Sequence, residues 1–263
     1  MDSTPQPRTD QTLQDPSSKR NWILLLMVVF GGFLIFGFSE NIKGPALPKM
    51  QADFRLNELQ LGLLLSLNSL GYLLACSFTG RLVRKIGLKW TNIAAFVSMA
   101  LSGLFIYRST GFGSLSASYF LLNVGNGLLE IGLGILAARI FTKNTGTMMN
   151  LAHFFYGLSS AAAPIAASSM MGWTLFGGEL GWRGMYAVML SLSLVPVIPA
   201  LLGKFSGDAQ NSGAALGLKP LYKDKTAWLI IAVLTFGVVA ELAVGGWLVN
   251  FLEKVYRWPT SEA

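Results

Sequence analysis

The sequence predicts an all-α protein that crosses a membrane several times. Of its 263 residues, 52% are hydrophobic and 13% are charged, with a mean hydropathy of +0.52. Soluble domains carry about 25% charged residues, so this balance excludes an ordinary soluble fold. The apolar residues also gather into seven segments, each about long enough to cross a bilayer as a helix. Basic residues lie between these segments, as they do in multi-pass membrane proteins.

The apolar segments define the predicted domains. They lie at about 22–42, 59–79, 90–107, 114–140, 147–171, 183–203 and 227–252. Residues 1–21 are polar and lack the apolar core and cleavage site of a signal peptide, which predicts a disordered cytoplasmic tail. Residues 22–203 then form a six-helix transmembrane bundle. The polar, small-residue stretch 204–226 predicts a cytoplasmic linker, and 227–263 a seventh helix that begins an incomplete second bundle.

The distribution of Lys and Arg predicts the orientation. With the N-terminus inside, thirteen of these residues fall on the cytoplasmic side and seven on the outer side. The densest group is in the short loop 80–90. The positive-inside rule therefore predicts a multi-pass protein of the cell membrane with a cytoplasmic N-terminus.

The composition also limits the kinds of metal, cofactor and catalytic chemistry that we expect of the protein. Cys76 is the single cysteine and His153 the single histidine, so the sequence offers no disulfide and no cysteine–histidine metal site. Nothing resembles a phosphate-binding Walker loop. We therefore expect no cofactor, no metal and no enzymatic activity. We also expect no nucleic-acid partner, because the basic residues follow membrane topology.

The segment 114–140 carries polar side chains at membrane depth. Asn123, Asn126 and Glu130 are spaced at zero, three and seven, so they share one helical face. An ionised carboxylate in the bilayer centre costs roughly 2.5–3.5 kcal/mol on insertion scales. Two interpretations follow: a substrate or proton site, or a protonated Glu130 that merely bonds to a neighbouring helix. Burial disfavours the charged carboxylate, so we expect Glu130 to hold a proton when the site is empty.

The fifth segment shows a similar spacing. Asn150, His153 and Gly157 lie on one face, with Tyr156 beside them. A single histidine is often a structural group, but in a membrane helix it can also relay protons. Both interpretations stay open for His153.

The first and last segments each contain an acid. Glu40 lies 18 residues beyond Trp22, which places it either at the outer membrane boundary or in an upper cavity. Glu241 lies fourteen residues past Ala227, near mid-membrane, and Trp247 follows it.

The loop after the second segment resembles the loop signature of the major facilitator superfamily. Gly80, Lys85, Gly87 and Lys89 fit its spacing, whereas Arg84 stands where the acid of the signature usually is. The resemblance implies that this loop helps to close the cytoplasmic face. The alternative is an ordinary basic inside loop.

The fifth segment resembles a second motif of the same superfamily. Gly157, Ala161 and the pair Ala163–Pro164 follow its Gly/Pro pattern, with alanines in place of some glycines. Small residues of this kind allow close helix packing.

Together these features are similar to the fucose-permease-like branch of the superfamily, over about residues 22–263. The resemblance implies proton-coupled symport of a sugar or similar small polar solute by alternating access. It also implies that Glu40 and Glu130 serve proton coupling and substrate binding. The other expected substrate contacts are Asn123, Asn126, Asn150, His153, Tyr156, Glu241 and Trp247.

Members of the superfamily have two six-helix bundles, whereas seven segments are present here. The resemblance thus implies a fragment, a truncated product or one part of a split transporter, with a C-terminal half or a second copy as partner. Drug or metabolite efflux is an alternative within the superfamily. A seven-helix receptor or structural membrane protein is an alternative of another class, although such receptors have their N-terminus outside.

Overall fold

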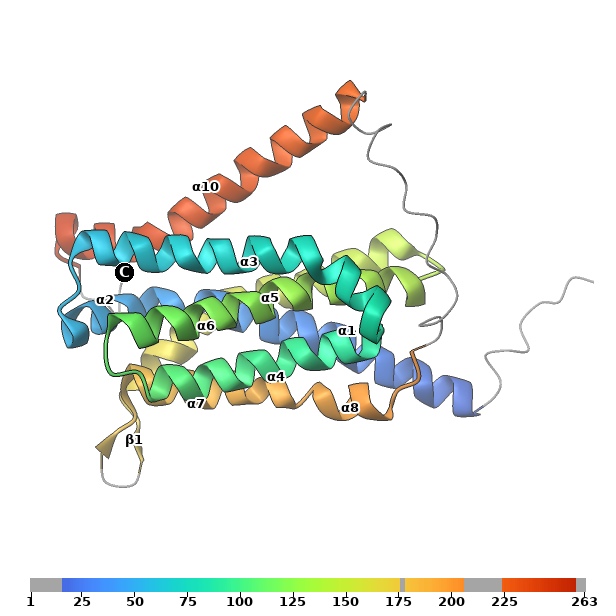
Figure 1. Cartoon of the computed structure of the whole chain (residues 1–263), viewed down its shortest axis with the longest axis horizontal. Coiled ribbons are helices and arrows are strands. Elements are labelled where there is room, and N and C mark those ends of the chain that lie inside the picture. The colour runs from blue at the N-terminus through green and yellow to red at the C-terminus, as the bar shows by residue number, and fades with distance from the viewer. Residues whose placement is uncertain (1–15, 176–177, 206–223, 259–263) are drawn as a thin grey trace, which may run out of the picture.

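The computed structural model describes residues 16–175, 178–205 and 224–258, and within them it is almost entirely helical (Figure 1). The elements are α1 (Pro16–Asn41), α2 (Lys43–Phe54), α3 (Glu58–Ile86), α4 (Leu88–Tyr107), α5 (Phe112–Ile140), α6 (Thr145–Met171), β1 (Thr174–Leu175), β2 (Gly178–Glu179), α7 (Gly181–Ser191), the 3-10 turn η2 (Leu192–Leu194), α8 (Val197–Leu202) and α10 (Lys225–Tyr256). The two short strands pair antiparallel. The predicted all-α class is confirmed.

Five of the described helical stretches are long and apolar enough to cross a membrane. They are Ser18–Phe54, Glu58–Ile86, Leu88–Tyr107, Phe112–Ile140 and Gly181–Leu202. Helix α6 has 27 residues, which is sufficient length, but it is less apolar. In α10 the apolar stretch Lys225–Ala240 is shorter. Five of the seven expected membrane crossings thus correspond to described helices of sufficient length and hydropathy. The total of seven crossings stays a prediction.

The first helical stretch extends beyond the predicted end near residue 42. After a turn at Ile42 the chain continues as α2, which buries Ala46 and Met50. Pro45 lies in the first turn of α2, where a backbone N–H has no intrahelical partner in any case. Pro48 removes only one further bond, and burial of the apolar face offsets that loss.

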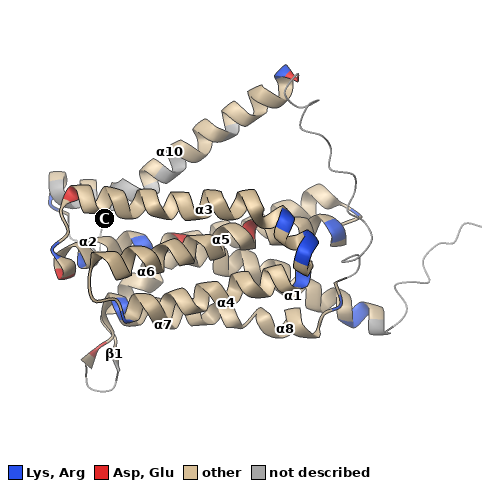
Figure 2. Ribbon diagram, viewed as in Figure 1, with Lys and Arg blue, Asp and Glu red and all other residues tan. Residues whose placement is uncertain are grey.

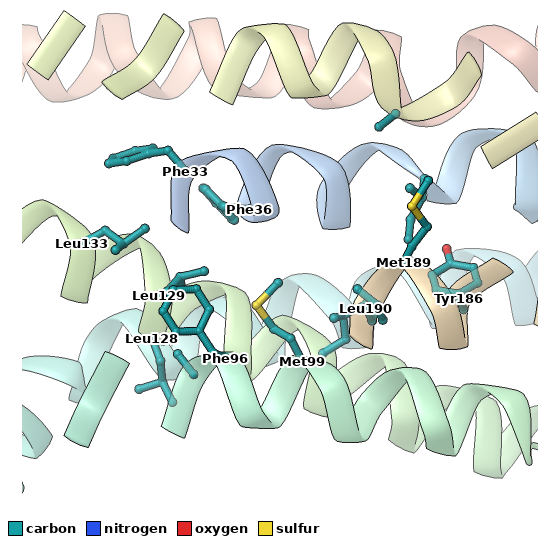
Figure 3. Close-up of a cluster of buried hydrophobic side chains, with 14 of the residues drawn as sticks. Phe33, Phe36, Phe96, Met99, Leu128, Leu129, Leu133, Tyr186, Met189 and Leu190 are labelled. Atoms are coloured by element: carbon teal, nitrogen blue, oxygen red, sulfur yellow. The ribbon is translucent and has the colours of Figure 1, made fainter. Parts of the chain in front are cut away.

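Helix α5 is the centre of the bundle and packs against α3, α4 and α1. Its glycines allow close approach, because a Cβ on Gly127 would lie 2.7 Å from the carbonyl oxygen of Tyr72 on α3. A Cβ on Gly125 would lie 3.2 Å from the carbonyl oxygen of Ala95 on α4. The apolar core continues from this helix into α1, α4 and α7 (Figure 3).

Helix α1 lies between α5 and α6 and packs against both. At Gly37 a Cβ would lie 2.5 Å from the carbonyl oxygen of Tyr156 on α6. Gly157 and Ala161 were expected to provide close packing on α6, and within the described bundle they do not. A Cβ on Gly157 would have no described neighbour within 4 Å, and Ala161 is exposed. These two small residues lie on a face of α6 that no described helix covers.

Helix α10 diverges from the bundle and contacts α2 (Figure 1). Most of its described apolar side chains are exposed, among them Leu229, Val233 and Phe236. The described part of α10 therefore packs little against the other helices. The side chains of Glu241 and Trp247 lie outside the described residues.

Candidate functional site

Glu40 is bonded through both of its carboxyl oxygens. Oε1 accepts from Nδ2 of Asn126 at 2.5 Å, and Oε2 pairs with Nζ of Lys43 at 3.0 Å. The Asn126 amide oxygen in turn accepts from the Ser39 hydroxyl at 2.8 Å. Asn126 is 1% exposed, and the Glu40 side chain is 15% exposed. These four residues, here called the carboxylate clamp, join α1 and the start of α2 to α5.

The clamp lies at mid-depth in the bundle. Asn126 follows the first residue of α5, Phe112, by fourteen residues, and Glu40 precedes the last residue of α2, Phe54, by the same number. Each distance corresponds to about 21 Å of helix. Of the two positions expected for Glu40, the structure therefore supports the interior one, and not the outer boundary.

Glu130 lies one helical turn after Asn126 and is partly buried. Within the described residues its carboxyl group makes no hydrogen bond, and the charge of Glu40 acts on it. Asn123 was expected on the same face as Glu130, and its amide donates to the Tyr119 carbonyl of its own helix at 3.0 Å. The structure thus brings Glu40, Asn126 and Glu130 together and gives Asn123 a local partner.

The polar residues of α6 meet α1. The His153 ring lies 5.1 Å from that of Phe33, edge to face, and the Tyr156 ring lies 5.1 Å from that of Phe36. Asn150 and His153 are exposed, and His153 makes no hydrogen bond to any described residue. Within the described residues, the hydrogen bonds of the carboxylate clamp involve neither of these two side chains.

Sequence reasoning missed Ser39 and Lys43. Lys43 lies three residues after Glu40, a spacing that favours an ion pair on a helix, so this signal was available. It also missed the bond from Asn41 to the Ser160 hydroxyl, which joins α1 to α6 at 2.9 Å. No sequence signal connects two side chains 119 positions apart.

A hollow lies away from the clamp, at the end of the bundle where α2 meets α7. It has a volume of about 590 Å³. Asp53 accepts there from the indole of Trp182 at 3.2 Å and pairs with Arg183 at 3.0 Å. The Arg183 guanidinium also lies 4.8 Å from the Phe54 ring and donates to the Ser109 carbonyl. These contacts tie α2 to α7 and to the end of α4, and the sequence had not indicated them.

At the opposite end, basic residues gather where α3 meets α4 (Figure 2). Gly87 joins these helices with φ +86°, a conformation that favours glycine. Lys89 donates to the carbonyls of Leu201 and Gly203 at 2.6 and 3.1 Å and so caps the C-terminus of α8. The predicted loop is shorter than expected, because Gly80, Arg84 and Lys85 lie within α3 and Lys89 lies in α4, which leaves Gly87 as the connection. Arg84 and Lys85 are exposed.

The comparison with protein families decides the classification. The model of the Major Facilitator Superfamily matches residues 29–263. The chain belongs to this superfamily. The family is one of carriers and not of enzymes, as the sequence predicted.

Its curated relatives include probable nitrate transporters named NarT. That of Staphylococcus haemolyticus strain JCSC1435 is 27% identical over 230 residues, which are 83% of this chain and 56% of the relative. That of Staphylococcus aureus strain JH9 is 27% identical over 180 residues, 68% of this chain and 43% of the relative. The chain thus spans about half the length of these relatives. Their names do not support the expected sugar-transporting branch, which stays a prediction.

Proposed function

We propose that the protein is a secondary active transporter of the cell membrane that couples proton movement to uptake of a small polar solute by alternating access. The solute class we propose is a neutral, hydroxyl-rich molecule such as a sugar, and the N-terminus faces the cytoplasm. The observation that carries the proposal is the arrangement of two acids at mid-depth: Glu40 on α1 bonds to Asn126 on α5, and Glu130 lies one helical turn after Asn126. Acidic residues at this depth are expensive and mark ion or substrate pathways.

The charges of the described site favour a neutral solute over an anion. Two carboxyl groups lie together, and the cation beside them, Lys43, is already paired with Glu40. Carboxylates and amides offer the hydrogen-bond acceptors and donors that hydroxyl groups need. We propose that Asn150, His153, Tyr156, Glu241 and Trp247 supply further contacts to the solute, together with a second six-helix bundle contributed by additional chain or by a second copy.

Nitrate transport is the second candidate, and the names of the relatives favour it. An anion needs positive charge at its binding site. For this candidate, Lys43 would have to exchange its pairing with Glu40 for a pairing with nitrate. The two candidates therefore differ in the role of Lys43, which binds the solute directly only in the nitrate candidate.

The test is uptake into proteoliposomes that contain both six-helix bundles. Radiolabelled sugars and nitrate are offered in parallel, with the external side more acidic. We expect saturable, gradient-dependent sugar uptake and none of nitrate. Glu130→Gln should abolish accumulation while leaving equilibrium exchange of the sugar. Gradient-driven nitrate uptake that Lys43→Met abolishes would instead establish the second candidate.

A further inference from the structure

We propose that the two acids have separate tasks: Glu40 stays ionised within the carboxylate clamp, and Glu130 binds and releases the transported proton. The assignment rests on the proposed function, since it presumes that protons are coupled to transport. It goes further by excluding Glu40 as a proton carrier and by making Lys43, Asn126 and Ser39 positioning residues.

The first step concerns the direction of the hydrogen bonds. The Ser39 hydroxyl has one hydrogen and lies 2.8 Å from the Asn126 amide oxygen and 3.0 Å from the Phe36 carbonyl. If Ser39 donates to Asn126, the Asn126 NH₂ group faces Glu40 and requires an acceptor there. If Ser39 donated to Phe36 and the amide were reversed, Glu40 would have to be protonated. The protonation of Glu40 therefore depends on its other neighbour.

That neighbour is Lys43, and it favours the arrangement in which Ser39 donates to the Asn126 oxygen and the Asn126 NH₂ group donates to Glu40. Its ammonium group donates to Oε2 of Glu40 at 3.0 Å, and both side chains are largely shielded. At this distance the ammonium group forms an ion pair with the carboxylate. Both Glu40 oxygens then accept charge-assisted bonds, from Lys43 and from Asn126. A protonated Glu40 would lose one acceptor and leave Lys43 without a counter-charge.

Within the described residues, Glu130 has neither an ion pair nor a hydrogen bond of the kind that Glu40 has. It is partly buried, makes no hydrogen bond to a described residue, and lies near the fixed charge of Glu40. Among the other titratable side chains on the packed helices, Tyr186 on α7 also experiences the charge of Glu40, whereas Cys76 on α3 lies against Gly127 and His153 on α6 against Phe33. Two negative charges in the same low-dielectric interior oppose one another. Because Glu40 keeps its charge, Glu130 is the group that gains and loses a proton.

The test is infrared spectroscopy of the purified chain in lipid nanodiscs at neutral pH, without solute or gradient. A protonated carboxylic acid has a carbonyl stretch that a carboxylate lacks. We expect Glu130→Gln to abolish this component of the spectrum, while the matched control Glu179→Gln, at an exposed acid, preserves it. A band that persists undiminished in Glu130→Gln would overturn the assignment.

A double-mutant cycle tests the ion pair independently of the spectrum. Melting temperatures in detergent are compared for Lys43→Met, Glu40→Gln and the double variant, with Lys49→Met as the control at an exposed lysine of α2. We expect each single substitution at the pair to lower the melting temperature, and the double variant to lose less than the sum of the singles. A double variant that loses the full sum of the two single losses would show no interaction between Lys43 and Glu40 and would overturn the assignment. Neither experiment measures transport. Failure of proton-coupled uptake would refute the proposed function, and these two experiments would still test the charge states assigned to Glu40 and Glu130.

Discussion

Replacing Asn126 by alanine should destabilise the bundle far more than the same change at Asn123. Both asparagines are buried on α5, at 1% and 8% exposure, and the same atoms are removed. The Asn126 amide bridges two helices through Glu40 and Ser39, whereas Asn123 bonds only to the backbone carbonyl of Tyr119. Comparing the two variants therefore separates the contribution of the clamp to stability from the general effect of truncating a buried asparagine.

The hydrogen bonds that each variant loses give the expected difference in the free energy of unfolding. A hydrogen bond to a charged group contributes about 1.5–3 kcal/mol. Neutral side-chain bonds between membrane helices average about 0.6 kcal/mol. Asn126→Ala loses one bond of each kind and leaves an oxygen of Glu40 without its partner, so we expect a loss of about 2–3.5 kcal/mol. Asn123→Ala loses one neutral bond, for which about 0.6 kcal/mol is expected.

The assay is reversible unfolding of the 263-residue chain in mixed micelles, followed by tryptophan fluorescence. The quantity compared is the free energy of unfolding of each variant relative to wild type. Equal losses for Asn126→Ala and Asn123→Ala would refute the reasoning, because the bridge from α5 to Glu40 would then contribute nothing. A third variant, Ser39→Ala, should lose less than Asn126→Ala, since it leaves the bond to Glu40 in place.

Three further predictions address packing, topology and competence. Gly37→Ala should lower the melting temperature, because its Cβ would lie 2.5 Å from a backbone oxygen of α6, whereas Gly62→Ala, with nothing within 4 Å, should not. In a Cys76→Ser background, an impermeant thiol reagent applied outside should label a cysteine at Ser261 and not one at Ser212; the opposite pattern would reverse the orientation. The 263 residues alone should insert into liposomes without transporting sugars, and saturable, gradient-dependent uptake by this chain would contradict the need for a second bundle.

The positions of the helices were largely predictable, and the contacts between them were not. Long apolar runs define membrane segments because backbone polar groups must be satisfied within each helix. The α2 continuation was missed because Gly44, Pro45 and Pro48 are typical of a loop, whereas the structure tolerates the prolines within the helix. The pair Asp53 and Arg183 was missed because its members are 130 positions apart. Periodicity assigns residues to a face of one helix, but not to a partner on another.

Asn123 shows the same limit in the predicted site. Helical spacing placed it with Asn126 and Glu130, and all three do lie on one side of α5. An asparagine in a helix can also bond to the carbonyl four residues earlier, and Asn123 does so with Tyr119. Asn126 instead finds stronger partners across the helix interface. The choice between the two depends on neighbours that a single sequence does not show.

The tripeptide Gly125-Asn126-Gly127 explains why the clamp forms on α5 at all. Successive residues of a helix point about 100° apart, so these three positions face three directions. Gly125 faces α4 and Gly127 faces α3, and both lack a Cβ where the neighbouring backbone approaches. The direction between them is left to Asn126, and it faces α1, where Glu40 lies. Glu130, four residues on, points about 40° from the same direction. Close packing on α3 and α4 thus fixes the orientation of the helix, and that orientation presents both polar groups to α1.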